Sequence, residues 1–194
     1  MSGAHILYLA RHGETDWNAE GKLQGQTDIP LNFRGRAQAV ALAAHLRSAR
    51  IAAIATSDLA RARSTADIVG AELGVPVTLV DAAFRERGYG IFEGLTQAQA
   101  QARDPAEWAR FVEGDGTSLG AEPLTAVAQR MYDATLRAAK ALPSPTLIVS
   151  HGRAIRELLT VAVGKSVPAI ANGGVYRFVV EDGRFTSAEM FVAI

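Results

Sequence analysis

Cysteine is absent from this sequence, and its absence removes several kinds of chemistry at once. A chain without a thiol has no disulfide, no thiolate nucleophile, no iron–sulfur cluster and no cysteine zinc site. Any covalent catalysis must therefore use another nucleophile.

An excess of one charge and a long hydrophobic run are also missing. Twenty Lys and Arg residues balance twenty Asp and Glu residues, so the formal net charge is zero. No overall field draws such a chain to nucleic acid or to an anionic membrane, and we expect neither as a partner. The start, MSGAH, holds no Lys or Arg, and the apolar run over 6–10 is too short for a signal peptide or a membrane span. We expect a cytoplasmic protein.

The chain does contain enough hydrophobic residues for one buried core. Its 194 residues are 48% hydrophobic, a length and composition typical of a little more than one globular domain. We find no internal repeat and no linker rich in Ser, Gly or Pro. The sequence therefore predicts a single domain over 1–194, and the composition leaves its oligomeric state open.

Short apolar runs alternate with helical patterns along most of the chain. Buried strands are predicted at 5–10, 51–56, 76–80 and 146–150, with helices at about 32–48, from Ser57-Asp58 to before Gly74, 123–141 and 153–163. This order is typical of a parallel sheet covered by helices on both faces. Val175 to Val180 and Arg184 to Met190 flank a turn-forming Glu181-Asp182-Gly183, so we expect a hairpin and an antiparallel edge strand.

The segment 95–122 is the least regular part of the sequence. It predicts a short helix over 96–103 and a flexible stretch, Glu113-Gly114-Asp115-Gly116. Irregular segments of this kind often determine which substrate a protein accepts, so we expect a lid or a specificity loop here.

Two histidines occupy matching places at strand ends. His12-Gly13 follows the strand 5–10, and His151-Gly152 follows the strand 146–150. The carboxyl edge of a parallel sheet is where such folds bind ligands, so the two rings meet there if the strands are neighbours. His5 begins a strand and His45 lies within a helix away from other ionisable groups, which favours structural roles for both.

Two arginines near these histidines indicate an anion as the ligand. Arg11 precedes His12, and Arg61 lies in the first turn of the helix that follows the strand 51–56. Guanidinium groups and the N–H groups of a helix start both suit a phosphate. The competing interpretation is that Arg61 and Arg63 are ordinary solvated helix charges.

Several other chemistries lack their motifs. The sequence contains no Gly-x-x-x-x-Gly-Lys-Ser/Thr phosphate loop, and the glycines at 88–94 have the wrong spacing for a dinucleotide fingerprint. A His-Glu-x-x-His helix, an Asp-rich calcium loop and a Gly-x-Ser-x-Gly elbow are missing too. We expect catalysis without a metal and without a cofactor.

The motifs together resemble a known family. The chain contains, in order, RHGETDWN from Arg11, LQGQTDIPL from Leu23, SDLARA from Ser57, FRE from Phe84 with EG at Glu93, and SHG from Ser150 with Ile155-Arg156. This series resembles the histidine phosphatase superfamily, in its phosphoglycerate mutase-like branch. The resemblance implies a three-layer α/β/α sandwich with a mostly parallel sheet and an antiparallel edge strand.

The resemblance also implies a role for each matching residue. His12 would be the nucleophile that takes the phosphoryl group, while Arg11, Arg61 and His151 would hold the phosphoryl oxygens. Glu86 would give a proton to the leaving alcohol and then activate water, although Arg85-Glu86-Arg87 by itself is typical of a solvated charge run. Further matching positions would line the substrate pocket: Asn18, Gln24, Gly25, Arg63, Tyr89 and Gly152.

Departures from the family pattern bear on the reaction. The larger mutases carry a long basic insertion after the Glu86 block, whereas 95–122 is short and offers chiefly Arg103 and Arg110. This favours a phosphomonoesterase acting on a small phosphorylated metabolite. The run ERGYG from Glu86 looks more like the mutase version, so phosphoglycerate mutase-type transfer is the second hypothesis. A phospho-ligand sensor without turnover is the third. GAEP at 120–123 stands where many relatives have GGES, which predicts a different pocket floor.

Overall fold

The computed structural model describes residues 3–115, 119–164 and 167–192. Its centre is a six-stranded sheet with the strand order β3-β2-β4-β1-β5-β6. The strands are β1 (His5–Arg11), β2 (Ala53–Thr56), β3 (Val77–Val80), β4 (Thr146–Ser150), β5 (Val175–Glu181) and β6 (Arg184–Val192). The first four run parallel, and β5 runs antiparallel to both β1 and β6. The predicted strands and hairpin are confirmed.

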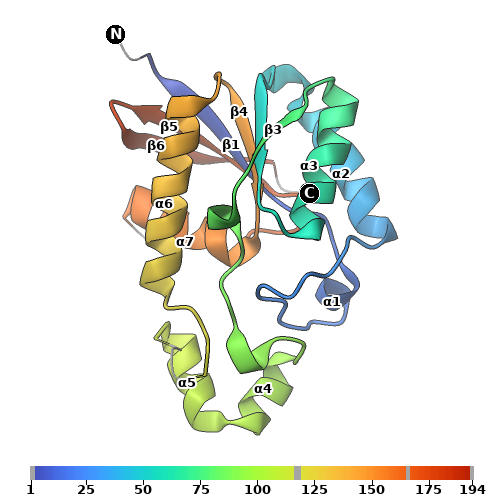
Figure 1. Ribbon diagram of the computed structural model, residues 1–194, viewed down its shortest axis with the longest axis vertical. Helices are drawn as coiled ribbons and strands as arrows, with labels where there is room; N and C mark the ends of the chain where they lie inside the picture. The colour runs from blue at the N-terminus through green and yellow to red at the C-terminus, as the bar shows by residue number, and fades with distance from the viewer. Residues whose placement is uncertain (1–2, 116–118, 165–166, 193–194) are drawn as a thin grey trace.

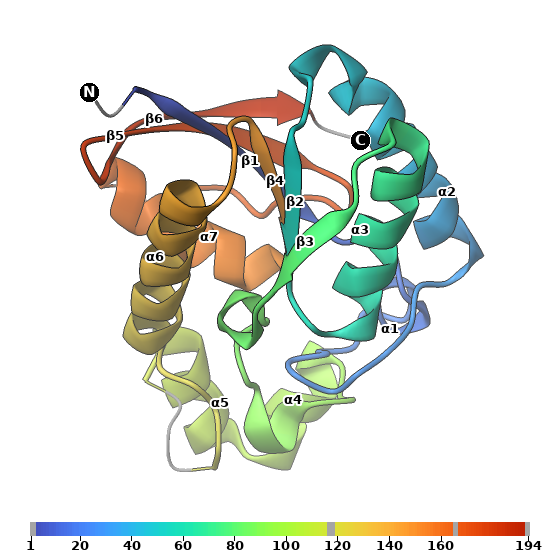
Figure 2. The same ribbon diagram turned by 45° about the horizontal axis from the view of Figure 1, so that its top comes forward.

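Helices cover both faces of this sheet (Figures 1 and 2). One face carries α2 (Phe33–Leu46) and α3 (Ala60–Leu73), and the other carries α6 (Leu124–Ala141) and α7 (Gly152–Val163). Side chains alternate along β1, so Leu7 and Leu9 pack toward α6 and α7 while Tyr8 and Ala10 pack toward α2 and α3. Each leucine buried in this way contributes roughly 2 kcal/mol. The predicted three-layer sandwich is confirmed.

The helix ends follow the residues that the sequence offers there. Asn32 caps α2, because its side chain accepts a hydrogen bond from the N–H of Gly35 at 2.8 Å. Gly74 ends α3 in the left-handed conformation, with φ of 71°. All four long helices were predicted, with bounds that differ by a few residues.

A small helical layer lies beyond the carboxyl edge of the sheet (Figure 1). It contains α4 (Gln97–Arg103) and α5 (Pro105–Glu113), while α1 (Asp16–Ala19) lies beside β1's end. Asp104 caps α5 and Gly114 ends it, with φ of 102°. Of the predicted flexible stretch Glu113-Gly114-Asp115-Gly116, Glu113 instead ends the helix α5 and Gly114 is its C-cap, since the Asp-Pro start and the glycine stop define a helix. Gly116 lies outside the described residues.

The layer made by α4 and α5, here called the cap, has a hydrophobic cluster of its own. Phe92, Ala100, Phe111 and Ala121 form its buried part. In the described ranges, no helix has the length and apolar character needed to cross a membrane.

Candidate active site

The two histidines that follow β1 and β4 lie side by side. In the register of these parallel strands Arg11 lies opposite Ser150, and these are the last residues of β1 and β4. His12 and His151 directly follow them at the same edge of the sheet. Their ring centroids are 5.1 Å apart, and both residues are buried. A Cβ on Gly13 would lie 2.3 Å from the carbonyl oxygen of Gly35, so the chain needs glycine directly after His12. The expectation that the two rings meet is confirmed.

The hydrogen bond of His12 sets its protonation. Nδ1 lies 2.6 Å from the carbonyl oxygen of Gly13, and because a carbonyl only accepts, Nδ1 carries the proton. Burial, and then the nearby Arg61 and Arg11 guanidinium groups, lower the pKa of His12 well below its ordinary value. The ring is therefore neutral at neutral pH, with a lone pair on Nε2.

His151 has the opposite tautomer. Its Nδ1 accepts a hydrogen bond from Nε of Arg61 at 3.2 Å, so the proton lies on Nε2. Burial and the Arg61 guanidinium again lower its pKa well below the ordinary value. Arg61 is itself fully buried, and its other nitrogens donate to the carbonyl oxygens of Thr27 and Gly25. This arrangement fixes His151 as a neutral hydrogen-bond donor.

Two buried donors at this place lack a partner. Nε of Arg11 and Nε2 of His151 make no hydrogen bond within the described part of the chain. The N–H of Arg11 at Nη1 already donates to the carbonyl oxygen of Ile170 at 2.7 Å. An unsatisfied buried donor costs about 1–3 kcal/mol, which an anionic oxygen would recover. The two donors and the guanidinium charges therefore form a site suited to a tetrahedral oxyanion.

Glu86 lies in the same pocket and is held by backbone N–H groups. Its carboxylate accepts from the N–H groups of Arg87, Arg153 and Ala154 at 2.9, 3.1 and 2.9 Å. The last two belong to the first turn of α7, where N–H groups have no partner inside the helix. Glu86 is buried, and so is Arg87, whereas Arg85 is partly exposed and pairs with Asp58. The interpretation of this run as a solvated charge cluster was wrong for Glu86 and Arg87.

Arg130 of α6 braces the segment that carries Glu86. Its guanidinium donates to the carbonyl oxygens of Ala83, Arg85 and Glu86 at 2.9, 2.6 and 2.9 Å. The remaining donors bind both carboxylate oxygens of Glu122, at 2.7 and 2.8 Å. A planar five-donor group suits such a task, and a lysine cannot replace it. The brace fixes the backbone from which Glu86 projects.

A second carboxylate holds the opposite wall. Glu93 accepts from the N–H groups of Gln26, Thr27 and Tyr89 and from the hydroxyl of Thr27. A Cβ on Gly25 would lie 2.0 Å from Oε1 of Glu93, and the φ of Gly25 is +55°. Only glycine fits there. The predicted pocket glycine therefore has a structural cause.

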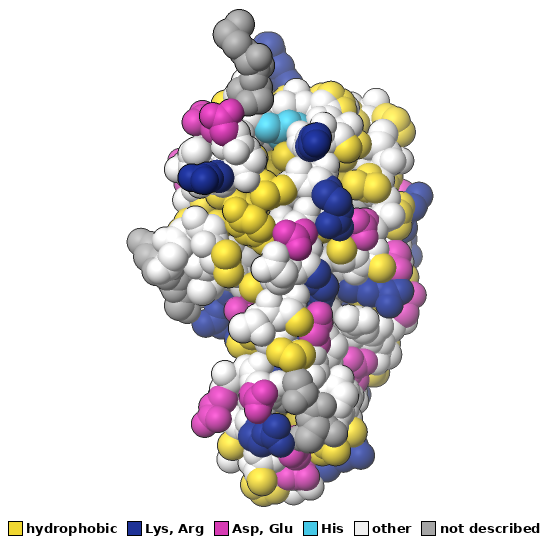
Figure 3. All heavy atoms as spheres, turned by 60° about the vertical axis from the view of Figure 1, so that its left-hand side comes forward, with side chains coloured by type: hydrophobic (Ala, Val, Ile, Leu, Met, Phe, Trp, Pro, Cys, Tyr) yellow, Lys and Arg dark blue, Asp and Glu magenta, His cyan; other side chains and the backbone are white. Residues whose placement is uncertain are grey.

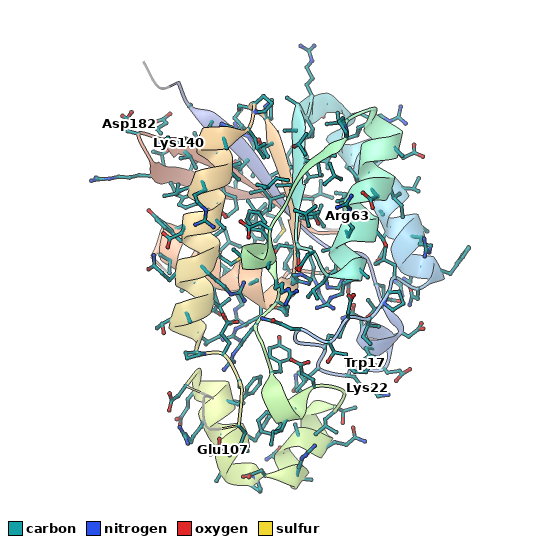
Figure 4. All side chains as sticks on the ribbon, viewed as in Figure 1. Trp17, Lys22, Arg63, Glu107, Lys140 and Asp182 are labelled. Atoms are coloured by element: carbon teal, nitrogen blue, oxygen red, sulfur yellow. The ribbon has the colours of Figure 1, made fainter. Side chains whose placement is uncertain are left out.

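The predicted pocket residues separate into two groups. The pocket is about 160 Å³ in volume, and its lining comprises Arg11, His12, Asn18, Lys22, Leu23, Gln24, Gly25, Arg61, Glu86 and Tyr89. His151 lies directly beneath, against His12 and Arg61. Arg63 is not part of this lining, because it points along α3 and pairs with Asp67 (Figure 4). Gly152 instead packs against the Arg11 guanidinium, where a Cβ would lie 3.2 Å from Nε.

Asn18 is oriented by its neighbours. Its side-chain oxygen accepts from the N–H and hydroxyl of Thr15 and from the side-chain amide of Asn172. These bonds leave the amide nitrogen of Asn18 as the group that it can offer to a ligand. Asn172 also donates to the carbonyl oxygen of His12.

A larger hollow, about 670 Å³ in volume, lies at the other end of the sheet. Its lining includes His5, Leu136, Lys140 and Val180, and Figure 3 shows hydrophobic side chains gathered on that face beneath basic side chains. Lys140 and Asp182 lie at the opposite end of the molecule from Glu107 of α5 (Figure 4). Parallel sheets bind ligands beyond the carboxyl ends of their strands, and this hollow is at the amino ends. The smaller pocket is therefore the candidate active site.

Sequence reasoning missed four residues that shape this site: Arg87, Glu93, Glu122 and Arg130. Each is a charged residue, buried in the case of Arg87 and half-buried in the other three, that is held by contacts between distant segments. The sequence offered a signal for two of them: Glu93 belongs to a block that resembles the family, and Glu122 belongs to the GAEP run before α6. Arg130 follows an ordinary helical pattern and gave no signal at all.

Known proteins share this arrangement of elements and motifs. The family model of the histidine phosphatase superfamily (branch 1) matches residues 7–192. The probable phosphoglycerate mutase GpmB of Salmonella paratyphi A is 38% identical over 163 residues, which are 81% of this chain and 74% of that protein.

Solved structures agree over nearly the whole chain. Bacillus stearothermophilus YhfR has a TM-score of 0.84 at 32% identity, with 93% of each chain covered. The mycobacterial glucosyl-3-phosphoglycerate phosphatase has a TM-score of 0.85 at 30% identity, with 99% of this chain and 100% of that one covered. Because the family model spans the sheet, the cap and both histidine motifs, this chain belongs to the histidine phosphatase superfamily, branch 1.

Proposed function

We propose that this protein is a metal-independent phosphomonoesterase that hydrolyses a small phosphorylated metabolite through a phosphohistidine on His12. One observation carries the proposal. The lone pair on Nε2 of a neutral, buried His12 lies beside unpaired donors of Arg11 and His151 and in the same pocket as Glu86. The phosphatases among the similar structures support a hydrolase of this class.

The first step transfers the phosphoryl group to the enzyme. Nε2 of His12 attacks phosphorus, and the bond from phosphorus to the ester oxygen breaks. Glu86, in its protonated form, gives its proton to that oxygen, so the alcohol leaves neutral. Arg11, Arg61 and the Nε2–H of His151 stabilise the negative charge on the phosphoryl oxygens.

The second step returns the enzyme to its starting state. The Glu86 carboxylate takes a proton from water, and the resulting hydroxide attacks the phosphorus of the phosphohistidine. The bond from phosphorus to nitrogen breaks, and its electron pair returns to Nε2 of His12. Inorganic phosphate then leaves, and Glu86 is again protonated for the next ester.

A mutase is the second candidate, because the similar GpmB protein is named a probable phosphoglycerate mutase. In that reaction the phosphohistidine passes its phosphoryl group to an acceptor other than water. The two arginines of α4 and α5 already bind other groups of the chain. Arg103 donates to the carbonyl oxygen of Ile91, and Arg110 pairs with Glu107 and Asp115. Neither arginine lines the pocket, and we therefore favour water as the acceptor.

The test is phosphate release from a panel of metabolite phosphates, with a chelator present throughout. We expect wild type to release phosphate and His12→Ala to lose about 10⁴-fold or more of that activity. His45→Ala is the matched control, since His45 is exposed on α2 and should leave the rate unchanged. Isomerised product without free phosphate, stimulated by a bisphosphorylated primer, would establish the mutase instead. Ester binding with no phosphohistidine would establish a sensor.

A further inference from the structure

A second cavity adjoins the candidate active site on the side of the cap. It is about 300 Å³ in volume, and its lining comprises Leu23, Arg87, Tyr89, Gln97, Trp108, Phe111, Val112 and Arg153. Leu23 and Tyr89 also line the pocket that holds His12. A group esterified to a phosphate in that pocket therefore has this cavity as its neighbour. We call it the cap cavity.

Aromatic rings form the wall of the cap cavity. Tyr89 meets Phe111 edge to face, with ring centroids 5.3 Å apart. Trp108 stacks on Phe111 at 5.3 Å with an angle of 25° between the rings. Flat aromatic surfaces of this kind favour a planar or apolar partner.

Arg87 supplies an unused donor at the same place. Its guanidinium lies 4.2 Å from the centroid of the Phe111 ring, and the residue is only 2% exposed. Nε donates to the carbonyl oxygen of Glu122 at 2.7 Å, and Nη1 donates to that of Phe111 at 3.1 Å. Nη2 is buried and has no hydrogen-bond partner within the described ranges. A buried guanidinium nitrogen without an acceptor is a donor that a water molecule or a ligand oxygen can satisfy.

The charges around the cap cavity point to the same kind of ligand. Its lining has two arginines and, over the part of the chain that the structure describes, no acidic residue. The charge of Arg153 is balanced by Glu157, with Nε and Oε1 2.6 Å apart, although this Nε makes no hydrogen bond within the described ranges. Arg87 is therefore the group that an acceptor oxygen of the ligand would meet.

We propose that the cap cavity binds the alcohol part of the substrate, an inference that rests on the proposed phosphomonoesterase. The substrate class is a phosphate ester of a bulky, planar or apolar alcohol that also carries a carboxylate or carbonyl oxygen. A cavity of about 300 Å³ exceeds what a three-carbon acid fills. Trp108 and Phe111 select the apolar body, and Arg87 selects the oxygen.

Three synthetic esters with similar leaving oxygens test this inference: ethyl phosphate, phenethyl phosphate and para-carboxyphenethyl phosphate. We expect kcat/KM to rise about tenfold from ethyl to phenethyl, because the ring is buried in the cavity. The carboxylate should add about another tenfold through Arg87.

Substitutions test which residue produces the gain in kcat/KM from the ring and which produces the gain from the carboxylate. Trp108→Ala should bring the phenethyl-to-ethyl ratio of kcat/KM close to one. Trp17→Ala is the matched control that keeps the ratio, since Trp17 of α1 is not part of the lining of either cavity. Arg87→Met should bring the ratio of kcat/KM for para-carboxyphenethyl phosphate to that for phenethyl phosphate close to one, and Arg87→Lys should keep part of this ratio. A purely structural role of Arg87 would lower kcat/KM for all three esters alike.

The possible failures are distinguishable. Equal kcat/KM for ethyl and phenethyl phosphate would overturn the cap cavity as a substrate site, while leaving the hydrolase in place. A tenfold preference that Trp108→Ala does not change would overturn it as well. No phosphate from any ester, together with no phosphohistidine, would overturn the proposed function itself.

Discussion

The sheet edge that carries His12 and the cap that faces it are built in different ways. At the sheet edge, buried charged and polar side chains are fixed by hydrogen bonds to backbone, as for Arg61 on Gly25 and Thr27. In the cap, a few aromatic rings around Phe111 provide the contacts, apart from the bonds of Arg87. The sheet edge belongs to the main core, whereas the cap packs around its own small cluster.

Under the proposed function, this difference separates chemistry from substrate selection. Hydrogen bonds with one correct geometry hold the groups proposed to meet phosphorus, where misplacement by about 1 Å can cost 10²-fold in rate. Aromatic contacts impose shape but tolerate exchange of one apolar side chain for another. We therefore expect changes at the sheet edge to alter the rate for every ester, and changes in the cap to alter which ester is preferred.

The largest effect should come from Glu86→Gln. Phosphate release from alkyl esters should fall about 10²–10⁴-fold, because the alcohol then leaves without a proton. Release from para-nitrophenyl phosphate should fall much less, since its leaving group is a weak base. Steady-state rates for both esters give the result, with Glu113→Gln on the exposed end of α5 as the control. An equal loss for both esters would remove the proton-donor role.

Phe92→Ala tests whether the cap is a separate unit. Phe92 is buried and touches both Trp108 and Phe111, at 5.6 and 5.4 Å between centroids. Removing it should weaken the cap cluster by about 3–5 kcal/mol. Amide hydrogen exchange should then accelerate in α4 and α5 while β1 and β4 stay protected.

Phe178→Ala is the matched change in the main core, where Phe178 is fully buried. It should lower the global free energy of unfolding and accelerate exchange throughout the sheet. If Phe92→Ala accelerates β1 and β4 as much as α5, the cap and the sheet unfold together and the comparison fails.

Loss of the Arg130 brace should have an intermediate effect on the rate. Arg130→Lys cannot reach the three carbonyl oxygens and Glu122 together, so we expect kcat for alkyl esters to fall about 10²-fold with little change in KM. Arg137→Lys is the control on the same helix, since Arg137 is exposed and pairs with Asp81 at the surface. If the brace acts through Glu86, Arg130→Lys should add little in the Glu86→Gln background. A full additional loss there would show that it acts otherwise.

The smallest effect concerns pH. His12 and His151 have pKa values well below that of an unfolded histidine, which is about 6.5. Below pH 6.5 the unfolded chain binds more protons than the folded one, so stability falls as pH falls. The slope should be on the order of 1 kcal/mol per pH unit for each histidine until its folded-state pKa is reached.

Urea unfolding of wild type and His12→Asn between pH 8 and 5 measures this slope, a window chosen because most carboxylates titrate below it. The variant should lose less stability on acidification than wild type does. Burial also lowers the pKa of His5, which is present in both proteins and cancels in the difference. Parallel pH profiles for the two proteins would contradict a neutral buried His12.

Most of the secondary structure followed from local patterns. The apolar runs gave β1 to β4, Asn32 and Gly74 marked helix ends, and the Gly183 turn gave the hairpin. The helix α5 did not follow, because its Asp-Pro start stands inside a polar segment that looks irregular from composition. Family motifs named Glu86 but gave no reason for its position, which depends on N–H groups of α7.

The sequence by itself determined the layers, the strand ends that carry the histidines, and the glycines that those close approaches require. These are local properties, since they follow from residue type and spacing along one segment. Only the tertiary structure decided which histidine tautomers form, which arginine braces Glu86, and that Arg63 turns away while Arg87 faces the cap cavity. The His151 tautomer and the Arg130 brace depend on partners tens of residues away, which no local pattern encodes. His12 bonds the adjacent Gly13 and Arg63 pairs with Asp67 one turn along α3, but only the folded chain shows that these local contacts are the ones that form.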